Sequence, residues 1–280
     1  MPDWRDQAIV LSARSFGEDA AVVTLLTESH GRHAGLVRGG QSRRMRPVLQ
    51  AGNKIVAVWR ARLYDQLGTM QVELNEAHAA HCLTDPLKLA SIAALASLIQ
   101  TATAEREPLP RVYDATTTYL THLTDPEVTD PLLWLSAYIR WEVGILAEVG
   151  FGLALDACAV TGETDHLAYV SPRTGAAVTK TAAGKHIAKL LPLPSFLQPS
   201  FLADTNTKKS QPLAQEVLDG MRLTAHFIDR EIFQGRKASL ATPRQRLHAM
   251  VEARYSKATS NEADANDTKS TTTHTMTARV

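Results

Sequence analysis

The chain has 280 residues, of which 30 are basic and 29 acidic, so a net charge of +1 argues against indiscriminate coating of nucleic acid. Its 44% hydrophobic and 21% charged content is typical of a globular protein with one or two domains. Two cysteines, Cys82 and Cys158, argue against a disulfide-rich secreted scaffold and favour a reducing cytoplasm. We expect no signal peptide and no membrane span, because residues 1–10 lack an apolar run and charges interrupt residues 132–150.

Residues 1–80 are predicted to be rich in β-strands, because short apolar and β-branched runs alternate with turns that contain glycine. The expected strands cover residues 7–15, 20–27, 32–38, 54–63 and 69–74. Five short strands favour a small closed barrel. The commonest such barrel that binds single strands is the OB type, and an SH3-like barrel is the structural alternative.

Residues 29–64 form a strongly basic stretch that contains no acid. Its eight cations are Arg32, Arg38, Arg43, Arg44, Arg46, Lys54, Arg60 and Arg62. Between residues 54 and 63 the alternation predicts that Trp59 and Leu63 face the core while the cations face outward. Such a positive surface suits a phosphate backbone. The alternative is a solvated sheet face whose cations pair with acids elsewhere. Tyr64 and Phe16 are candidates for stacking on bases.

Residues 81–256 are predicted to form a helical domain. Asp85-Pro86 and Asp130-Pro131 are typical helix starts, with aspartate as the N-cap and proline in the first turn. A further helix is expected near residues 112–123, and others at 184–191, 213–232 and 243–255. Apolar residues at helical spacing predict a bundle with a continuous core. Residues 257–280 are a polar tail that we expect to be disordered.

A second group of cations lies near the end of the helical domain: Arg236, Lys237, Arg244 and Arg246. Acidic residues are interleaved with them, as on a solvated helix face. The pattern leaves open whether this group is such a face or a secondary site for DNA or a partner.

Residues 154–182 are rich in turns and contain Cys158. A structural zinc site needs four ligands, and only His166 could join Cys158 nearby, so we predict no zinc and no other cofactor. The chain carries no phosphate-binding loop, no dinucleotide-binding fingerprint, no HExxH and no nucleophile elbow. An enzyme is therefore disfavoured, and the remaining enzymatic hypothesis is an unrecognised site around Cys158 and His166.

Four segments resemble the RecO family of bacterial recombination mediators. They cover residues 8–40, 49–68, 151–175 and 223–236, the last followed by PRQRL at 243–247. The resemblance implies an α+β protein with an N-terminal five-stranded OB-type barrel over residues 1–80, and a helical bundle over residues 81–256. It also implies a zinc-knuckle-like excursion near residues 154–182. In the zinc-binding members this knuckle has two CxxC pairs, whereas here Thr161 follows Cys158 and the second pair falls at about Val178 and Thr181, which makes it degenerate.

The resemblance also implies activity without catalysis. Members bind single- and double-stranded DNA, anneal complementary strands, and work with RecR to load RecA onto strands coated by single-strand-binding protein, whose C-terminal tail is an expected partner. DNA contacts carry over only to the basic barrel positions: Arg38, Arg43, Arg44, Arg46, Lys54, Arg60 and Arg62. The expected location is the cytoplasm, in association with the nucleoid. The alternative is a protein-interaction adaptor whose basic face docks an acidic peptide.

Overall fold

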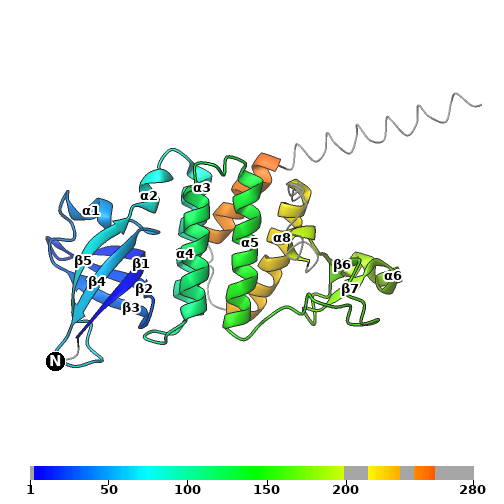
Figure 1. Ribbon diagram of the computed structural model, residues 1–280, viewed down its shortest axis with the longest axis horizontal. Helices are drawn as coiled ribbons and strands as arrows, with labels where there is room; N and C mark the ends of the chain where they lie inside the picture. Colours follow the sequence, from blue (N-terminus) through cyan, green and yellow to red (C-terminus); the bar gives the residue numbers. More distant parts are fainter. Residues whose placement is uncertain (1–2, 199–213, 234–242, 256–280) are drawn as a thin grey trace, which may run out of the picture.

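A barrel, a set of helices and a small second sheet follow one another along the long axis of the molecule (Figure 1). This computed structural model describes residues 3–198, 214–233 and 243–255. The tail that we predict to be disordered, residues 257–280, lies outside the described residues. None of the helices within the described ranges combines the length and apolarity needed to cross a bilayer.

Five strands close the N-terminal barrel in the order β1-β2-β3-β5-β4, which confirms the predicted β-rich region. They are β1 Asp3–Phe16, β2 Ala20–Thr27, β3 Gly31–Val37, β4 Lys54–Arg60 and β5 Thr69–Glu76. The β3–β5 pair is parallel and the other pairs are antiparallel, as in an OB-like barrel. Strand β4 ends earlier than expected, so Leu63 lies exposed in the β4–β5 loop and not in the core.

The middle of strand β1, residues 8–11, is buried on both of its faces, and this joins the barrel to the helices. Ala8 and Val10 belong to the barrel core, which also contains Trp59 as predicted. Ile9 and Leu11 point to the opposite face and pack with the helical core. Alternate side chains of a strand point to opposite faces, so a continuous apolar run places one strand in two cores at once.

Long helices form the middle of the molecule. They are α3 Pro86–Ala102, α4 Pro110–Thr124, α5 Pro131–Glu148, α8 Ala214–Phe227 and a last helix over residues 243–255. The short helices α1 Met45–Val48 and α2 His78–His81 flank the barrel, and a π-helical turn, η3 Ile228–Ile232, extends α8. Both predicted N-caps are confirmed, because the Asp85 and Asp130 carboxylates accept hydrogen bonds from first-turn amides.

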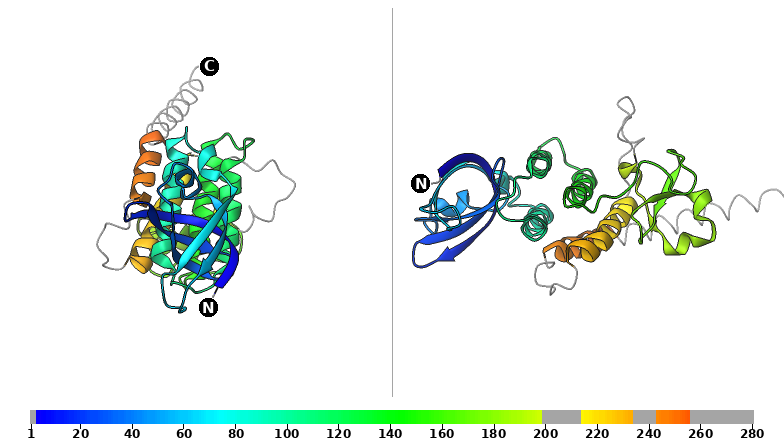
Figure 2. Two further views of the ribbon diagram at one scale, coloured as in Figure 1. Left: turned by 90° about the vertical axis from the view of Figure 1, so that its left-hand side faces the viewer. Right: turned by 90° about the horizontal axis from the view of Figure 1, so that it is seen from below.

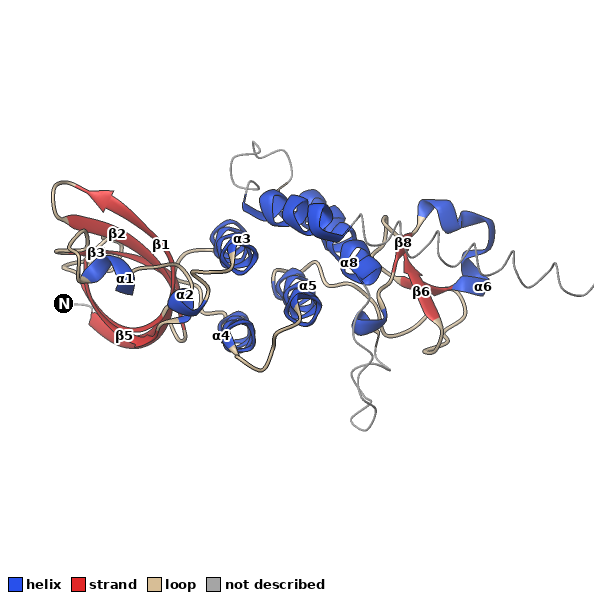
Figure 3. Ribbon diagram, turned by 90° about the horizontal axis from the view of Figure 1, so that it is seen from above, coloured by secondary structure: helices blue, strands red, loops and turns tan. Residues whose placement is uncertain are grey.

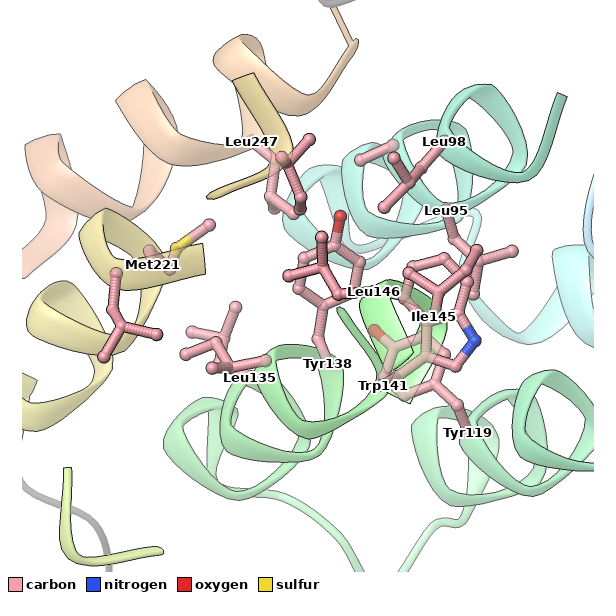
Figure 4. Close-up of a cluster of buried hydrophobic side chains, with 14 of the residues drawn as sticks. Leu95, Leu98, Tyr119, Leu135, Tyr138, Trp141, Ile145, Leu146, Met221 and Leu247 are labelled. Carbon is pink, nitrogen blue, oxygen red and sulfur yellow. The ribbon is translucent and has the colours of Figure 1, made fainter. Parts of the chain in front are cut away.

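The helical core gathers large side chains from several helices (Figure 4). Tyr138 of α5 stands between Tyr119 of α4 and Trp141, with ring centroids 5.8 Å away in both pairs. Met221 of α8 and Leu247 of the last helix close the cluster from the other side (Figure 4). The continuous apolar core predicted for the bundle is therefore confirmed.

A small sheet lies on the opposite side of the helices from the barrel (Figures 2 and 3). It contains β6 Leu167–Val170, β7 Ala177–Thr179 and β8 Leu191–Pro192, in the order β7-β6-β8. The helical turns α6 Lys180–Ala183, η1 Gly184–Lys189 and η2 Ser195–Leu197 complete it. The helix predicted at 184–191 is instead a 3-10 turn that leads into an edge strand. Val170, Ala177 and Phe196 join this unit to the helical core.

Candidate nucleic-acid interface

The connection between β3 and β4, residues 38–53, is an ordered platform on the barrel. The Asn53 amide donates to the carbonyls of Pro47 and Val48 at 2.8 and 3.2 Å. The Gln41 side chain donates to the carbonyls of Gly17 and Ala20, which ties the platform to the β1–β2 turn. These bonds hold the connection without using its cations, so the arginines remain available.

Four of the predicted DNA-binding arginines project from this platform into solvent: Arg38, Arg43, Arg44 and Arg46. None of them forms an ion pair with an acid among the residues that the structure describes. Exposed, unpaired guanidinium groups on a fixed loop can each reach a phosphate oxygen without a cost to the fold. We name this set the arginine platform.

A groove of about 420 Å³ runs beside the platform and reveals a cation that the sequence did not single out. Arg46 of the platform and Arg14 of β1 both line it. Arg14 also lines a second groove of about 570 Å³, which extends from the barrel to Ala93 and Ala96 of α3. The sequence pattern does not single out Arg14, because this residue precedes the acid-free stretch. Only the pairing of β1 with β2 brings it beside residues 40–51.

The remaining predicted barrel cations lie in different surroundings. Lys54 is half-buried and its ammonium lies 3.1 Å from the Glu76 carboxylate of β5, so it is not the free cation we expected. Arg60 is exposed on β4, but its partners across the sheet are Asp3 of β1 and Thr69 of β5. Arg62 is exposed in the β4–β5 loop. The predicted surface therefore divides into the arginine platform and a smaller group at the β4–β5 loop.

The two parts of this surface are neighbours. A third groove, of about 430 Å³, lies between Arg38 and Met45 on one side and Thr69 and Gln71 of β5 on the other. Thr69 is also the cross-strand partner of Arg60. Thr69 is therefore a neighbour of both Arg38 of the platform and Arg60 of β4.

The secondary cluster of cations is not a surface patch as a whole. Arg244 is 5% exposed and forms a two-point ion pair with Glu142 of α5, so it cannot reach DNA or a partner. An arginine is buried in a core only with a partner for its charge, and here that partner lies 102 residues earlier in the chain. Arg246 is exposed, whereas Arg236 and Lys237 lie outside the described residues.

The turn-rich segment does not form a metal cluster in the described ranges. No group of three or more His, Cys, Asp or Glu residues gathers there to hold an ion. Cys158 is buried and accepts a hydrogen bond from the Thr179 amide at 3.4 Å, so Thr179 is its neighbour from the adjacent strand. Burial raises the pKa of Cys158, but hydrogen bonds from Thr161 and Thr179 outweigh it and lower this pKa to about 6. His166 is exposed and makes no hydrogen bond with Cys158 in this part of the structure.

Two family models match the chain in sequence. The model "Recombination protein O N terminal" matches residues 1–77, and "Recombination protein O C terminal" matches residues 83–241. The chain belongs to the RecO family. The resemblance noted in the sequence is thereby confirmed, and the chain is a DNA repair protein of this family with an OB-like N-terminal domain.

Individual RecO proteins are similar over nearly their whole length. DNA repair protein RecO of Rhodospirillum centenum is 49% identical over 247 residues, which cover 88% of this chain and 93% of that protein. RecO of Rhodospirillum rubrum is 44% identical, covering 88% and 95% of the two chains. RecO of Methylobacterium nodulans is 42% identical, covering 89% and 98%.

Proposed function

We propose that this RecO-family protein is a recombination mediator that acts without catalysis. It binds single- and double-stranded DNA, anneals complementary strands, and helps RecR to load RecA onto strands coated by single-strand-binding protein. It needs no cofactor, and DNA binding brings it to the nucleoid. The arginine platform supports this proposal most directly, because it offers unpaired cations to phosphates on a surface already held in place.

Annealing requires a surface that holds strands of any sequence. Phosphate contacts fix a strand in position but carry no base information, so the platform meets this requirement. Arg14 extends the cationic surface along the first two grooves, and Arg38 extends it toward β5. A DNA strand bound through its phosphates keeps its base edges free to pair with a complementary strand.

An adaptor function is the second candidate, and the lining of the second groove favours it. The second groove combines apolar lining from Leu11, Val22 and Ala93 with the guanidinium group of Arg14. Arg32 also lines it, but its guanidinium is already bound to the Thr103 carbonyl and the Glu105 carboxylate. Such a groove fits a short acidic peptide with apolar side chains, like the C-terminal tail expected of single-strand-binding protein. Under this hypothesis DNA binding would be incidental to peptide capture.

The decisive experiment replaces Arg43, Arg44 and Arg46 together by alanine. Affinity for a single strand is measured by fluorescence anisotropy across a salt series, together with annealing of complementary oligonucleotides. The affinity should fall for every sequence alike. The slope of log K against log salt should flatten by roughly 0.7 for every phosphate that the variant no longer neutralises, and annealing should fall in parallel.

A matched control removes three exposed arginines elsewhere: Arg111 of α4, Arg173 of the β6–β7 turn and Arg254 of the last helix. It changes the net charge by the same amount and should leave DNA affinity almost unchanged. If the platform variant keeps the wild-type salt slope, the platform is not the DNA site. If the platform variant binds DNA normally, while an Arg14→Ala variant no longer binds an acidic peptide at the second groove, the adaptor function replaces our proposal.

A further inference from the structure

The β4–β5 loop, residues 61–68, exposes large apolar side chains beside one cation and one acid, Arg62 and Asp65. Leu63, Tyr64 and Leu67 are 55%, 53% and 40% exposed, and Arg62 lies beside them in the sequence. Apolar side chains exposed together on one loop mark an interaction site more often than an accident of folding.

Hydrogen bonds from outside the loop hold its backbone in place. The buried Trp59 indole donates to the Leu67 carbonyl at 2.8 Å. The Arg106 guanidinium donates to the carbonyl of Tyr64 and, at 2.8 Å, to that of Gln66. A loop fixed at three carbonyls offers its side chains in a defined orientation, so little conformational entropy is lost when it binds.

Arg106 belongs to the connection between α3 and α4 and is itself held in an unfavourable conformation. Its φ of +62° is in the left-handed region, which residues other than glycine seldom adopt. Its amide donates to the Arg32 carbonyl at 2.8 Å, so both its backbone and its guanidinium are fixed. Strain of this kind persists where surrounding contacts enforce it, and it is concentrated at functional sites.

The Tyr64 ring packs against Trp59 and Arg106. Its centroid lies 6.0 Å from that of Trp59, with an interplanar angle of 79°. The Arg106 guanidinium carbon lies 5.2 Å from the Tyr64 ring centroid and 5.8 Å from that of Trp59. The ring is thus backed by an aromatic residue and a cation, while more than half of the residue faces solvent.

We propose that Tyr64, with Arg106 as its positioning residue, is a stacking platform for one unpaired base and favours single strands over duplex. The inference rests on the DNA binding proposed above and adds a base contact to its phosphate contacts. An exposed aromatic ring stacks on any base, whatever the sequence. In a duplex the faces of internal bases are covered by their neighbours. Arg60 and Arg62 are exposed and precede Tyr64 closely in the chain, so a single strand held by these cations passes near the ring.

The test compares an ordinary single strand with an abasic strand that has the same number of phosphates. Wild-type protein should bind the ordinary strand more tightly, and Tyr64→Leu should remove most of that difference. The loss for the ordinary strand should be about 5- to 100-fold, as expected for one stacked base. Tyr64→Leu should keep its affinity for the abasic strand and for duplex, and its salt slope should equal that of the wild type. Tyr64→Trp should retain the base-dependent affinity.

Arg106→Gln tests the positioning role through the same comparison. It should reduce the preference for the ordinary over the abasic strand, and the double variant with Tyr64→Leu should lose no more than Tyr64→Leu alone. Additive losses would show that Arg106 binds DNA directly, and would overturn its positioning role.

The outcomes separate this inference from the proposed function. If the wild type binds neither strand, the proposed function fails. If it binds both but Tyr64→Leu matches it on each, only the stacking inference is overturned. If Tyr64→Leu binds DNA normally but no longer binds RecR, the loop is a protein-docking site and the inference is likewise overturned.

Discussion

Arg244 and Glu142 form a buried two-point ion pair that connects the last helix to the middle of α5. The guanidinium nitrogens lie 2.7 and 2.9 Å from the two carboxylate oxygens. Thr224 of α8 donates to the same carboxylate at 2.5 Å, and Arg244 also donates to the Met221 carbonyl. Burial lowers the pKa of Arg244, but the adjacent carboxylate outweighs it and raises this pKa above its ordinary value. The ion pair therefore links the last helix, α5 and α8.

Replacing Arg244 by methionine should lower the free energy of unfolding by about 3–5 kcal/mol, because it leaves the Glu142 charge buried without its partner. Chemical denaturation measures this change. The double variant Glu142→Leu/Arg244→Met should be closer to the wild type than Arg244→Met alone. Arg246→Met, at an exposed position of the same helix, is the control. Equal destabilisation by the Arg244 and Arg246 variants would contradict the structural role of the pair.

Gly31 should not tolerate a side chain, because the barrel and the α3–α4 connection meet there. A Cβ at Gly31 would lie 2.0 Å from the Glu107 carbonyl oxygen, and φ is +67°. Gly31→Ala combines backbone strain with overpacking and should cost about 2–4 kcal/mol of stability.

Gly39 provides a matched control for this substitution. It has a similar φ of +65° but no atom of the described structure within 4 Å of the added Cβ. Gly39→Ala should cost only about 1 kcal/mol, for the backbone strain alone. Melting curves of both variants measure the difference, and equal losses would show that the contact with Glu107 is not rigid.

His33 should make the protein less stable in mild acid. It is fully buried between Trp4 and Trp59, and neither ring nitrogen has a hydrogen-bond partner among the described residues. Burial, together with the positive charges of Arg106 and His30, lowers the pKa of His33 to about 4. An unfolded histidine titrates near pH 6.5, so between these values the unfolded chain binds more protons.

The contribution of His33 to stability is therefore complete above about pH 6.5 and is lost as the pH falls toward 4, by on the order of 3 kcal/mol. Denaturation at a series of pH values measures this loss. His33→Phe should flatten that part of the curve, whereas His81→Phe, at an exposed position of α2, should not. Parallel curves for the wild type and His33→Phe would contradict the prediction.

The purified protein should carry no tightly bound zinc. Cys158 has Thr161 and Thr179 as its polar neighbours, and hydroxyl groups are poor ligands for this ion. Cys158→Ser should cost no more than about 1–3 kcal/mol, as for other small buried side chains. Elemental analysis that finds close to one zinc per chain would refute the prediction.

Much of the architecture follows from local patterns in the sequence. Period-two alternation predicted the strands and placed Trp59 in the barrel core, because the parity of a strand depends only on its own residues. The Asp-Pro pairs predicted the starts of α3 and α5, because a cap acts within one helical turn. The acid-free stretch predicted the arginine platform, because the arginines of the platform are close together in the sequence.

The tertiary structure decided which cations are free and which side chains work together. Lys54 pairs with Glu76 and Arg244 is buried against Glu142. Arg14 joins Arg46 at one groove, and Arg106 reaches Tyr64 from another connection. Each of these relationships joins residues that lie far apart in the sequence. Charge and hydropathy along the chain indicate which side chains need an ion-pair or packing partner. Strand pairing and helix packing determine which residue is close enough to be that partner.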